Sequence, residues 1–298
     1  MKELIIENKD DNKKLNTVIL KAFPNLNVNA LYKALRKKDI RINGARVNEN
    51  VLVHSGDNVK IFIADDILFG SSNAGISDVK VNIEKVFEDE DILVIDKPSG
   101  IEACGGNSVT ELLEKEYGTF ISPCHRLDRN TSGLMLFAKN QASLDILFDK
   151  FKNHEIEKHY LCRVYGVPRE KHRILKSYLF KDNKKSMVYI SDLPKKGYVE
   201  INTEYFVKSF NSKENTSILE VILHTGKTHQ IRAHLAHIGY PIIGDGKYGK
   251  NDINKKFNQK TQNLCSYILK FNFRSESGHL SYLNKKEIKL EKLPKYLK

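Results

Sequence analysis

Apolar and polar positions near the start of the chain follow the spacing of two helices. The first helix has one apolar face and ends at Pro24, because proline cannot continue a helix. Its apolar residues are Leu15, Val18, Ile19 and Ala22. The second helix has Asn27 or Asn29 as its candidate cap and runs to about Lys38. The spacing therefore predicts two short helices, each with a face suited to packing.

The second helix separates apolar from basic side chains. Its apolar residues are Leu31, Ala34 and Leu35, and its basic residues are Lys33, Arg36 and Lys37. At about 100° per residue the two sets lie on opposite faces of the helix. We expect one face to pack and the other to form a solvated positive stripe.

The segment 40–47 predicts a basic β-hairpin. Asn43-Gly44 between alternating apolar residues is typical of a two-residue turn. In that register Arg41 faces Arg46 on one side of the ribbon, and the apolar pairs share the other side. Like charges directly opposite destabilise a hairpin, and a phosphate between them would relieve the cost. The alternative is a solvated pair that splays into water, and the hairpin alone favours neither.

Residues 13–64 combine these elements with a closing strand over 58–63. This order of helix, helix, basic hairpin and strand resembles the small α/β RNA-binding module named after a ribosomal small-subunit protein. The RNA contacts that this resemblance implies are Lys33, Arg36, Lys37, Arg41 and Arg46. Residues 65–80 are rich in Gly, Ser and Asn, and we interpret them as an interdomain linker.

From residue 81 onward, short β-rich runs outnumber helical patterns. The expected strands are 92–95, 134–138, 160–165, 201–207 and 218–223, and the expected helices are 109–116, 142–151 and 229–238. The two kinds of element do not alternate regularly, which argues against a doubly wound parallel sheet. Residues 81–298 are therefore predicted to form an α+β domain, with a mostly antiparallel mixed β-sheet and flanking helices.

Composition narrows the function classes. The 298 residues carry a net charge of +12, which makes a polyanion a plausible partner. No apolar run approaches the roughly 18 residues of a membrane span, and the first residues lack the apolar run of a secretory signal. We therefore expect a cytoplasmic protein that does not bind membranes. The cysteines are too far apart to indicate a disulfide framework or a zinc site. They are Cys104, Cys124, Cys162 and Cys265.

Three matches to ligand-binding motifs lack the context that those motifs need. Residues 244–249 match GxGxxG, but no apolar helix follows them, so a glycine-rich turn is expected. Residues 226–228 end like a phosphate-binding loop but lack its upstream glycine. His229, His234 and His237 have neither the spacing nor the carboxylate of a zinc-binding helix. The sequence thus predicts no metal and no nucleotide cofactor.

The most informative segment is 124–138, where charged residues immediately precede a buried strand. If residues 126–128 are extended, Arg126 and Asp128 point the same way and Leu127 points into the core. One acid in a cationic loop beside a sheet is a typical way to keep a carboxylate ionised. On chemistry alone, a structural Asp–Arg pair or a turn is the more common explanation.

This segment, HRLDRNTSGLMLFAKN, closely resembles the signature of pseudouridine synthases of the ribosomal large-subunit type. Further stretches match that family in the expected order, and together they cover about residues 83–250. They are Asp96–Gly100, Lys158–Gly166 and Leu223–Leu235, the last followed by Gly244-Asp245 and Tyr248-Gly249. The N-terminal module also occurs in this family. The resemblance implies conversion of uridine in structured RNA, expected to be 23S-type large-subunit ribosomal RNA, to pseudouridine without a cofactor.

The resemblance also implies roles for residues of these motifs. Asp128 is the expected catalytic carboxylate, and Arg232 is the guanidinium that keeps it ionised. Tyr160 would stack on the flipped uracil and relay a proton, and Arg126 would fill the space that the base leaves. The other expected RNA contacts in these motifs are Lys227 and His229. Attack at C1′ of the ribose and attack at C6 of the base both stay open.

Three stretches depart from the family pattern. Lys227 stands where the family commonly has Arg, residues 101–106 lack a His-Pro pair, and residues 264–266 read Leu-Cys-Ser in place of Leu-His-Ala. None of these is a catalytic position, so the departures concern the choice of substrate. The alternative function is a non-catalytic RNA-binding or ribosome-assembly factor, and the intact catalytic positions argue against it. A monomer is expected.

Overall fold

The computed structural model describes residues 1–24, 26, 28–68 and 83–297. The chain forms two compact units, Met1–Lys80 and Val81–Lys298. Across the described residues, no helix is long and apolar enough to cross a membrane.

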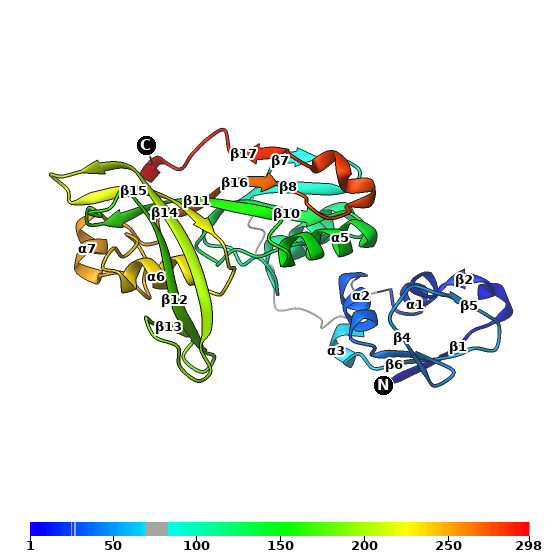
Figure 1. The fold of residues 1–298 in the computed structure, drawn as a ribbon. Helices are drawn as coiled ribbons and strands as arrows, with labels where there is room; N and C mark the ends of the chain where they lie inside the picture. The colour runs from blue at the N-terminus through cyan, green and yellow to red at the C-terminus, as the bar shows by residue number, and fades with distance from the viewer. Residues whose placement is uncertain (25, 27, 69–82, 298) are drawn as a thin grey trace. The chain divides into compact units, whose positions relative to one another are not determined.

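The N-terminal unit contains a four-stranded antiparallel sheet with the strand order β1-β6-β3-β4 (Figure 1). These strands are β1 (Lys2–Ile5), β3 (Ile40–Ile42), β4 (Ala45–Val47) and β6 (Asn58–Ile61). The helices α1 (Leu15–Ala22) and α2 (Val28–Arg36) bury their apolar faces in the same core as the strands. The smaller elements are η1 (Asn8–Asp10), β2 (Lys13–Lys14), β5 (Leu52–Val53) and α3 (Asp65–Leu68). The two predicted helices are confirmed, and the basic residues of the second, Lys33, Arg36 and Lys37, are exposed as expected.

The hairpin β3–β4 has the predicted register. Arg41 lies opposite Arg46, and the turn residues Asn43 and Gly44 have φ angles of +52° and +86°, the backbone that a two-residue hairpin turn requires. On the other side of β3, Lys60 of β6 lies opposite Arg41. The structure therefore extends the arginine pair to a row of three cations across the sheet.

Three boundaries differ from the expectation. Lys2–Ile5 forms β1 and pairs with β6, so the sheet includes residues before position 13. Local sequence patterns do not reveal this strand, because its partner β6 is distant in sequence. Residues 65–68, expected in the linker, form α3 because Leu68 is fully buried in the core. The rest of that expected linker lies outside the described residues. Asn29 lies within α2 and does not cap it, and Asn27 is also outside the described part.

In the second unit, eleven strands of the described chain form one sheet. Its main path is β13-β12-β14-β15-β11-β16-β10-β8-β7, with β9 beside β10 and β17 beside β16. The strands are β7 (Glu84–Glu88), β8 (Ile92–Lys97), β9 (Ser122–Pro123), β10 (Ser132–Ala138), β11 (Ile156–Tyr165), β12 (His172–Asp182), β13 (Met187–Ser191), β14 (Val199–Asn211), β15 (Thr216–Leu223), β16 (Leu264–Phe271) and β17 (Glu287–Lys289). Described neighbours are antiparallel except β10 and β16, which are parallel. The predicted α+β class with a mostly antiparallel sheet is confirmed.

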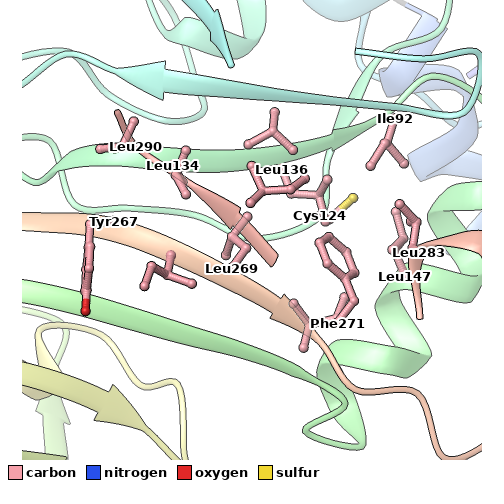
Figure 2. Packing of buried hydrophobic residues seen from close by; sticks show 14 of the residues in the cluster. Ile92, Cys124, Leu134, Leu136, Leu147, Tyr267, Leu269, Phe271, Leu283 and Leu290 are labelled. Carbon is pink, nitrogen blue, oxygen red and sulfur yellow. The ribbon is translucent and has the colours of Figure 1, made fainter. Parts of the chain in front are cut away.

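Alternate residues of the central strands are buried on opposite faces of this sheet. Leu136 of β10 belongs to one core and Phe137 to the other. The first core also contains residues of α5 (Gln141–Lys152) and η2 (Gly278–Leu283), and Figure 2 shows Leu147 and Leu283 within it. The second core contains residues of α4 (Val109–Tyr117) and α6 (Gln230–His237). The remaining helices are α7 (Asn251–Lys256) and η3 (Lys295–Leu297).

Ser266 of β16 joins the two strands that carry the informative motifs. It pairs with Gly133 of β10 on one side and with Tyr160 of β11 on the other. Gly133 has a φ of +107°, and a Cβ there would lie 2.0 Å from the Ser266 carbonyl oxygen, so this approach requires glycine. The contact brings the loop before β10 beside Tyr160.

Candidate active site

A pocket of about 540 Å³ lies where the expected motifs meet. Its lining comes from the loop 124–131, from the segment 151–160 at the end of α5 and the start of β11, from the segment 223–232 and from Leu264. Asp128, Tyr160 and Arg232 all line it, although more than 100 positions separate Asp128 from Arg232 in the sequence. Arg126, Lys227 and His229 line the same pocket. The structure thus gathers the six site residues that the sequence suggested in this domain.

Asp128 is held in a loop whose neighbours have the predicted directions. Leu127 is buried, whereas Arg126 is exposed and Asp128 half-buried, and both of these polar residues line the pocket. The backbone N–H of Thr131 donates to the Asp128 carbonyl oxygen at 3.0 Å, which closes the turn after it. The alternation places the carboxylate at the pocket while Leu127 anchors the loop in the core.

Lys97 fixes this loop from behind. Its fully buried ammonium donates to the carbonyl oxygens of Pro98 and Ile101 at 2.8 Å and of Arg129 at 3.0 Å. Burial lowers the pKa of Lys97 to about 8. A buried ammonium is tolerated only when its donors are satisfied, so these three bonds tie the end of β8 to the residue after Asp128. Lys97 belongs to one of the matched motifs, but its sequence context alone does not predict this role.

Arg232 joins two carboxylates. Its Nη1 donates to Asp128 Oδ2 at 2.8 Å, while Nε and Nη2 donate to the two oxygens of Asp245 at 2.7 and 2.9 Å. Burial acts to lower the pKa of Arg232, but the bonds to Asp245 and Asp128 outweigh it and the pKa lies above its usual value. The bidentate bond to Asp245 fixes the guanidinium plane, and this plane directs Nη1 at Asp128.

Asp245 was missed as a site residue, although it lies within the segment that matched GxGxxG. Burial would raise its pKa, but the bonds from Arg232 and from the N–H groups of Lys247 and Tyr248 hold the pKa below its ordinary value. The glycines serve this turn: a Cβ on Gly244 would lie 2.0 Å from the Thr261 carbonyl oxygen. The expected glycine-rich turn is therefore present, and it holds a carboxylate.

Tyr160 is buried on β11 and faces the pocket. Burial, together with the charge of Asp128, raises the pKa of its phenol, so the side chain is a neutral hydrogen-bonding ring at physiological pH. A flat, neutral ring in this position can stack on a nucleobase.

His229 stands at the start of α6 with a φ of +54°. Its Nδ1 is 2.8 Å from the Tyr248 hydroxyl, which accepts the Val188 N–H at 2.9 Å, and its Nε2 is 3.9 Å from Asp128 Oδ2. Burial lowers the pKa of His229, and the nearby Arg232 adds to that effect against the opposing charge of Asp128. The histidine that was expected to contact RNA therefore also borders the carboxylate.

The basic residues of the hairpin, of α2 and of the turn after α2 belong to the N-terminal unit. They are Lys33, Arg36, Lys37, Arg41 and Arg46. The other histidines of the 229–237 segment have different partners: His234 is buried beside Thr203, and His237 bonds Asp192 at 2.8 Å.

The chain is similar to several known proteins. Residues 91–237 match the family described as RNA pseudouridylate synthase. The ribosomal large subunit pseudouridine synthase C of Buchnera aphidicola subsp. Acyrthosiphon pisum is 33% identical over 91% of this chain and 89% of its own. The Haemophilus influenzae protein of that name is 27% identical over 93% and 87%. The solved structure of human RNA Pseudouridylate Synthase Domain Containing 4 shares the fold, with a TM-score of 0.58, 20% identity and coverage of 72% and 90%.

The chain therefore belongs to the RNA pseudouridine synthase family. It is an isomerase that converts uridine in RNA to pseudouridine, as the sequence motifs predicted.

Proposed function

We propose that this enzyme modifies large-subunit ribosomal RNA and that Asp128 is its nucleophile. The 2.8 Å bond between Arg232 and Asp128 in the pocket beside Tyr160 carries the proposal. The RNA class is supported by the names of the relatives that match most of the chain.

The reaction is an isomerisation in which atoms and charge balance. The N1–C1′ bond breaks, the uracil turns, and a C5–C1′ bond forms. C5 loses a proton and N1 gains one, so no oxidant or co-substrate is consumed. Attack by Asp128 at C1′ and attack at C6 both require an ionised carboxylate, and the guanidinium of Arg232 favours that form.

The other pocket residues act on the base. Since a paired uridine cannot reach Asp128, it must leave the stack, and the planar side chain of Arg126 fills the space it leaves. The Tyr160 ring supports the flipped uracil, and its neutral phenol relays a proton. Lys227 and His229 contact the RNA at the pocket edge. The exposed cations Lys33, Arg36, Lys37 and Arg46, together with the half-buried Arg41, give the N-terminal unit a surface for RNA backbone.

Release of tritium from RNA made with 5-tritiated uridine tests the nucleophile. Asp128→Asn keeps the shape of the side chain and removes its charge, so we expect RNA binding to persist and tritium release to be abolished. Asp149→Asn, on the exposed side of α5, is the matched control and should react like the wild type. Turnover by Asp128→Asn at the wild-type rate would refute the assignment.

The role of Arg126 needs a comparison of two substrates. Arg126→Ala should slow modification of a folded RNA much more than that of a flexible single strand, in which less stacking must be broken. The exposed Arg169→Ala serves as the control. Equal losses on both substrates would exclude a role in holding the base out of the stack. Mapping pseudouridine in cells with and without the enzyme would identify the RNA.

A further inference from the structure

Lys158 lies on the same face of β11 as Tyr160, two residues before it, and both line the pocket. Its ammonium is 4.9 Å from the centre of the Phe151 ring. It is also 3.6 Å from the point where a Cβ on Gly226 would lie, so it stands between the end of α5 and the segment 223–232. Nothing in the catalytic scheme above uses this side chain.

The ammonium of Lys158 has no hydrogen-bonding or charged partner within the part of the chain that the structure describes. Among the described residues, no hydrogen bond or ion pair involves the side chain of Lys158, and burial lowers its pKa to about 8. Lys97 has a similarly lowered pKa, but its ammonium donates to three carbonyl oxygens. The Phe151 ring offers Lys158 only a cation–π contact, which leaves its donors free for a ligand.

The positive charge around Lys158 favours the binding of an anion. Lys158 and Lys227 both act to lower the pKa of His154, after the larger effect of burial, and all three residues line the pocket. Of the described residues that line the pocket, Asp128 is the one carboxylate, and Arg232 already bonds it. The side of the pocket that holds Lys158 is therefore cationic, and the described residues that line it supply no carboxylate there.

We propose that Lys158 binds a phosphodiester group next to the target uridine, with Lys227 and His154 at the same subsite. This proposal rests on the proposed function, because it assumes RNA in this pocket. A phosphate oxygen carries the charge that the ammonium needs, whereas a uracil carbonyl would satisfy a donor and leave the charge unpaired. The compact ammonium suits one phosphate oxygen as a point charge. The contact fixes the backbone beside the flipped base and so places C1′ in register with Asp128.

The test measures RNA affinity in the Asp128→Asn background, so that turnover plays no part. The probe is an RNA hairpin with a single uridine in its loop, made with ordinary linkages or with one uncharged methylphosphonate 5′ or 3′ of that uridine. We expect Lys158→Met to weaken binding of the ordinary hairpin about ten-fold and to lower the salt slope by about one. For the hairpin whose methylphosphonate replaces the contacted phosphate, the Asp128→Asn parent and its Lys158→Met variant should have equal affinities.

Two variants keep the test independent of folding. Lys158→Arg retains the charge and should recover most of the affinity, and the exposed Lys181→Met on β12 should change neither affinity nor the response to methylphosphonate. The proposal is overturned if Lys158→Met binds the ordinary hairpin like the parent, or if its loss is the same on all three hairpins. The second result would assign Lys158 to the base or to the structure of the pocket. Failure of the nucleophile assignment would appear in the tritium assay and would leave this binding result unaffected.

Discussion

Arg232 bonds Asp128 at 2.8 Å while its other nitrogens hold Asp245 at 2.7 and 2.9 Å. Asp128 is thus positioned by a carboxylate that it does not touch. Asp245 receives two further backbone N–H bonds, from Lys247 and Tyr248, so the guanidinium is fixed to a rigid turn. This support fixes the position of the Asp128 carboxylate oxygen before RNA binds.

Asp245→Asn tests this arrangement. The amide cannot accept both Arg232 bonds, so we expect kcat for tritium release to fall roughly 100-fold, with RNA affinity nearly unchanged. The matched control is Asp192→Asn, an exposed carboxylate that bonds His237. A drop in RNA affinity alone would show that Asp245 supports binding and not the geometry of Asp128.

Gly133→Ala tests the contact between β10 and β16. The new Cβ would lie 2.0 Å from the Ser266 carbonyl oxygen, at a φ that disfavours side chains. We expect the free energy of unfolding, measured by urea denaturation, to fall by about 3 kcal/mol or more. Gly106→Ala, where the new Cβ meets nothing within 4 Å, should change it by less than about 0.5 kcal/mol. Similar losses in both variants would mean that the close approach is not the cause.

The buried pair Lys150–Glu155 gives stability a defined pH dependence. Burial would raise the pKa of Glu155, but bonds from Arg274, Lys150 and Ser275 hold it at about 2. A carboxyl group whose pKa is depressed on folding contributes stability above its unfolded value, near 4.5. That contribution is lost as the pH falls toward 2.

Glu155→Gln should therefore cost about 3 kcal/mol at pH 7, because it leaves the Lys150 charge buried. The difference from the wild type should shrink between pH 4.5 and 2, as followed by urea denaturation at each pH. The exposed Glu291→Gln should show no such trend. A difference that is constant with pH would rule out the ionised pair as its source.

Arg41 and Arg46 should contribute to RNA affinity through phosphate contacts. The double change to Ala should weaken binding and reduce the salt slope by about 1.5, and it should spare kcat at saturating RNA. The exposed Lys289→Ala on β17 is the control. An unchanged slope would leave the two arginines as solvated surface charges.

The two arginines should differ in their effect on stability. Arg46→Ala relieves the like-charge pair and should stabilise the unit by a few tenths of a kcal/mol. Arg41→Ala relieves the same repulsion but also removes a guanidinium that lies 4.9 Å from the centre of the Phe62 ring. In thermal unfolding, the Tm of Arg46→Ala should therefore be higher than the Tm of Arg41→Ala. The reverse order would contradict this account.

Local patterns were sufficient for most of the fold. The helices α1 and α2, the register of the Asn43-Gly44 hairpin and the central strands of the second unit follow from periodicity and turn chemistry, which act over a few residues. The alternation Arg126-Leu127-Asp128 predicts that the acid faces away from the core, independently of its partner. The match of ordered motifs then indicated which acid to single out.

Tertiary structure decided what depends on contacts distant in sequence. β1 needs β6, and α3 needs a core that accepts Leu68, so neither was visible in its own few residues. Asp245 became part of the site only when its turn was placed beside α6. The sequence also does not distinguish Lys97, with three carbonyl partners, from Lys158, with none among the described residues. Burial and hydrogen-bond satisfaction are properties of the packed chain, and they separate a structural lysine from one available to a ligand.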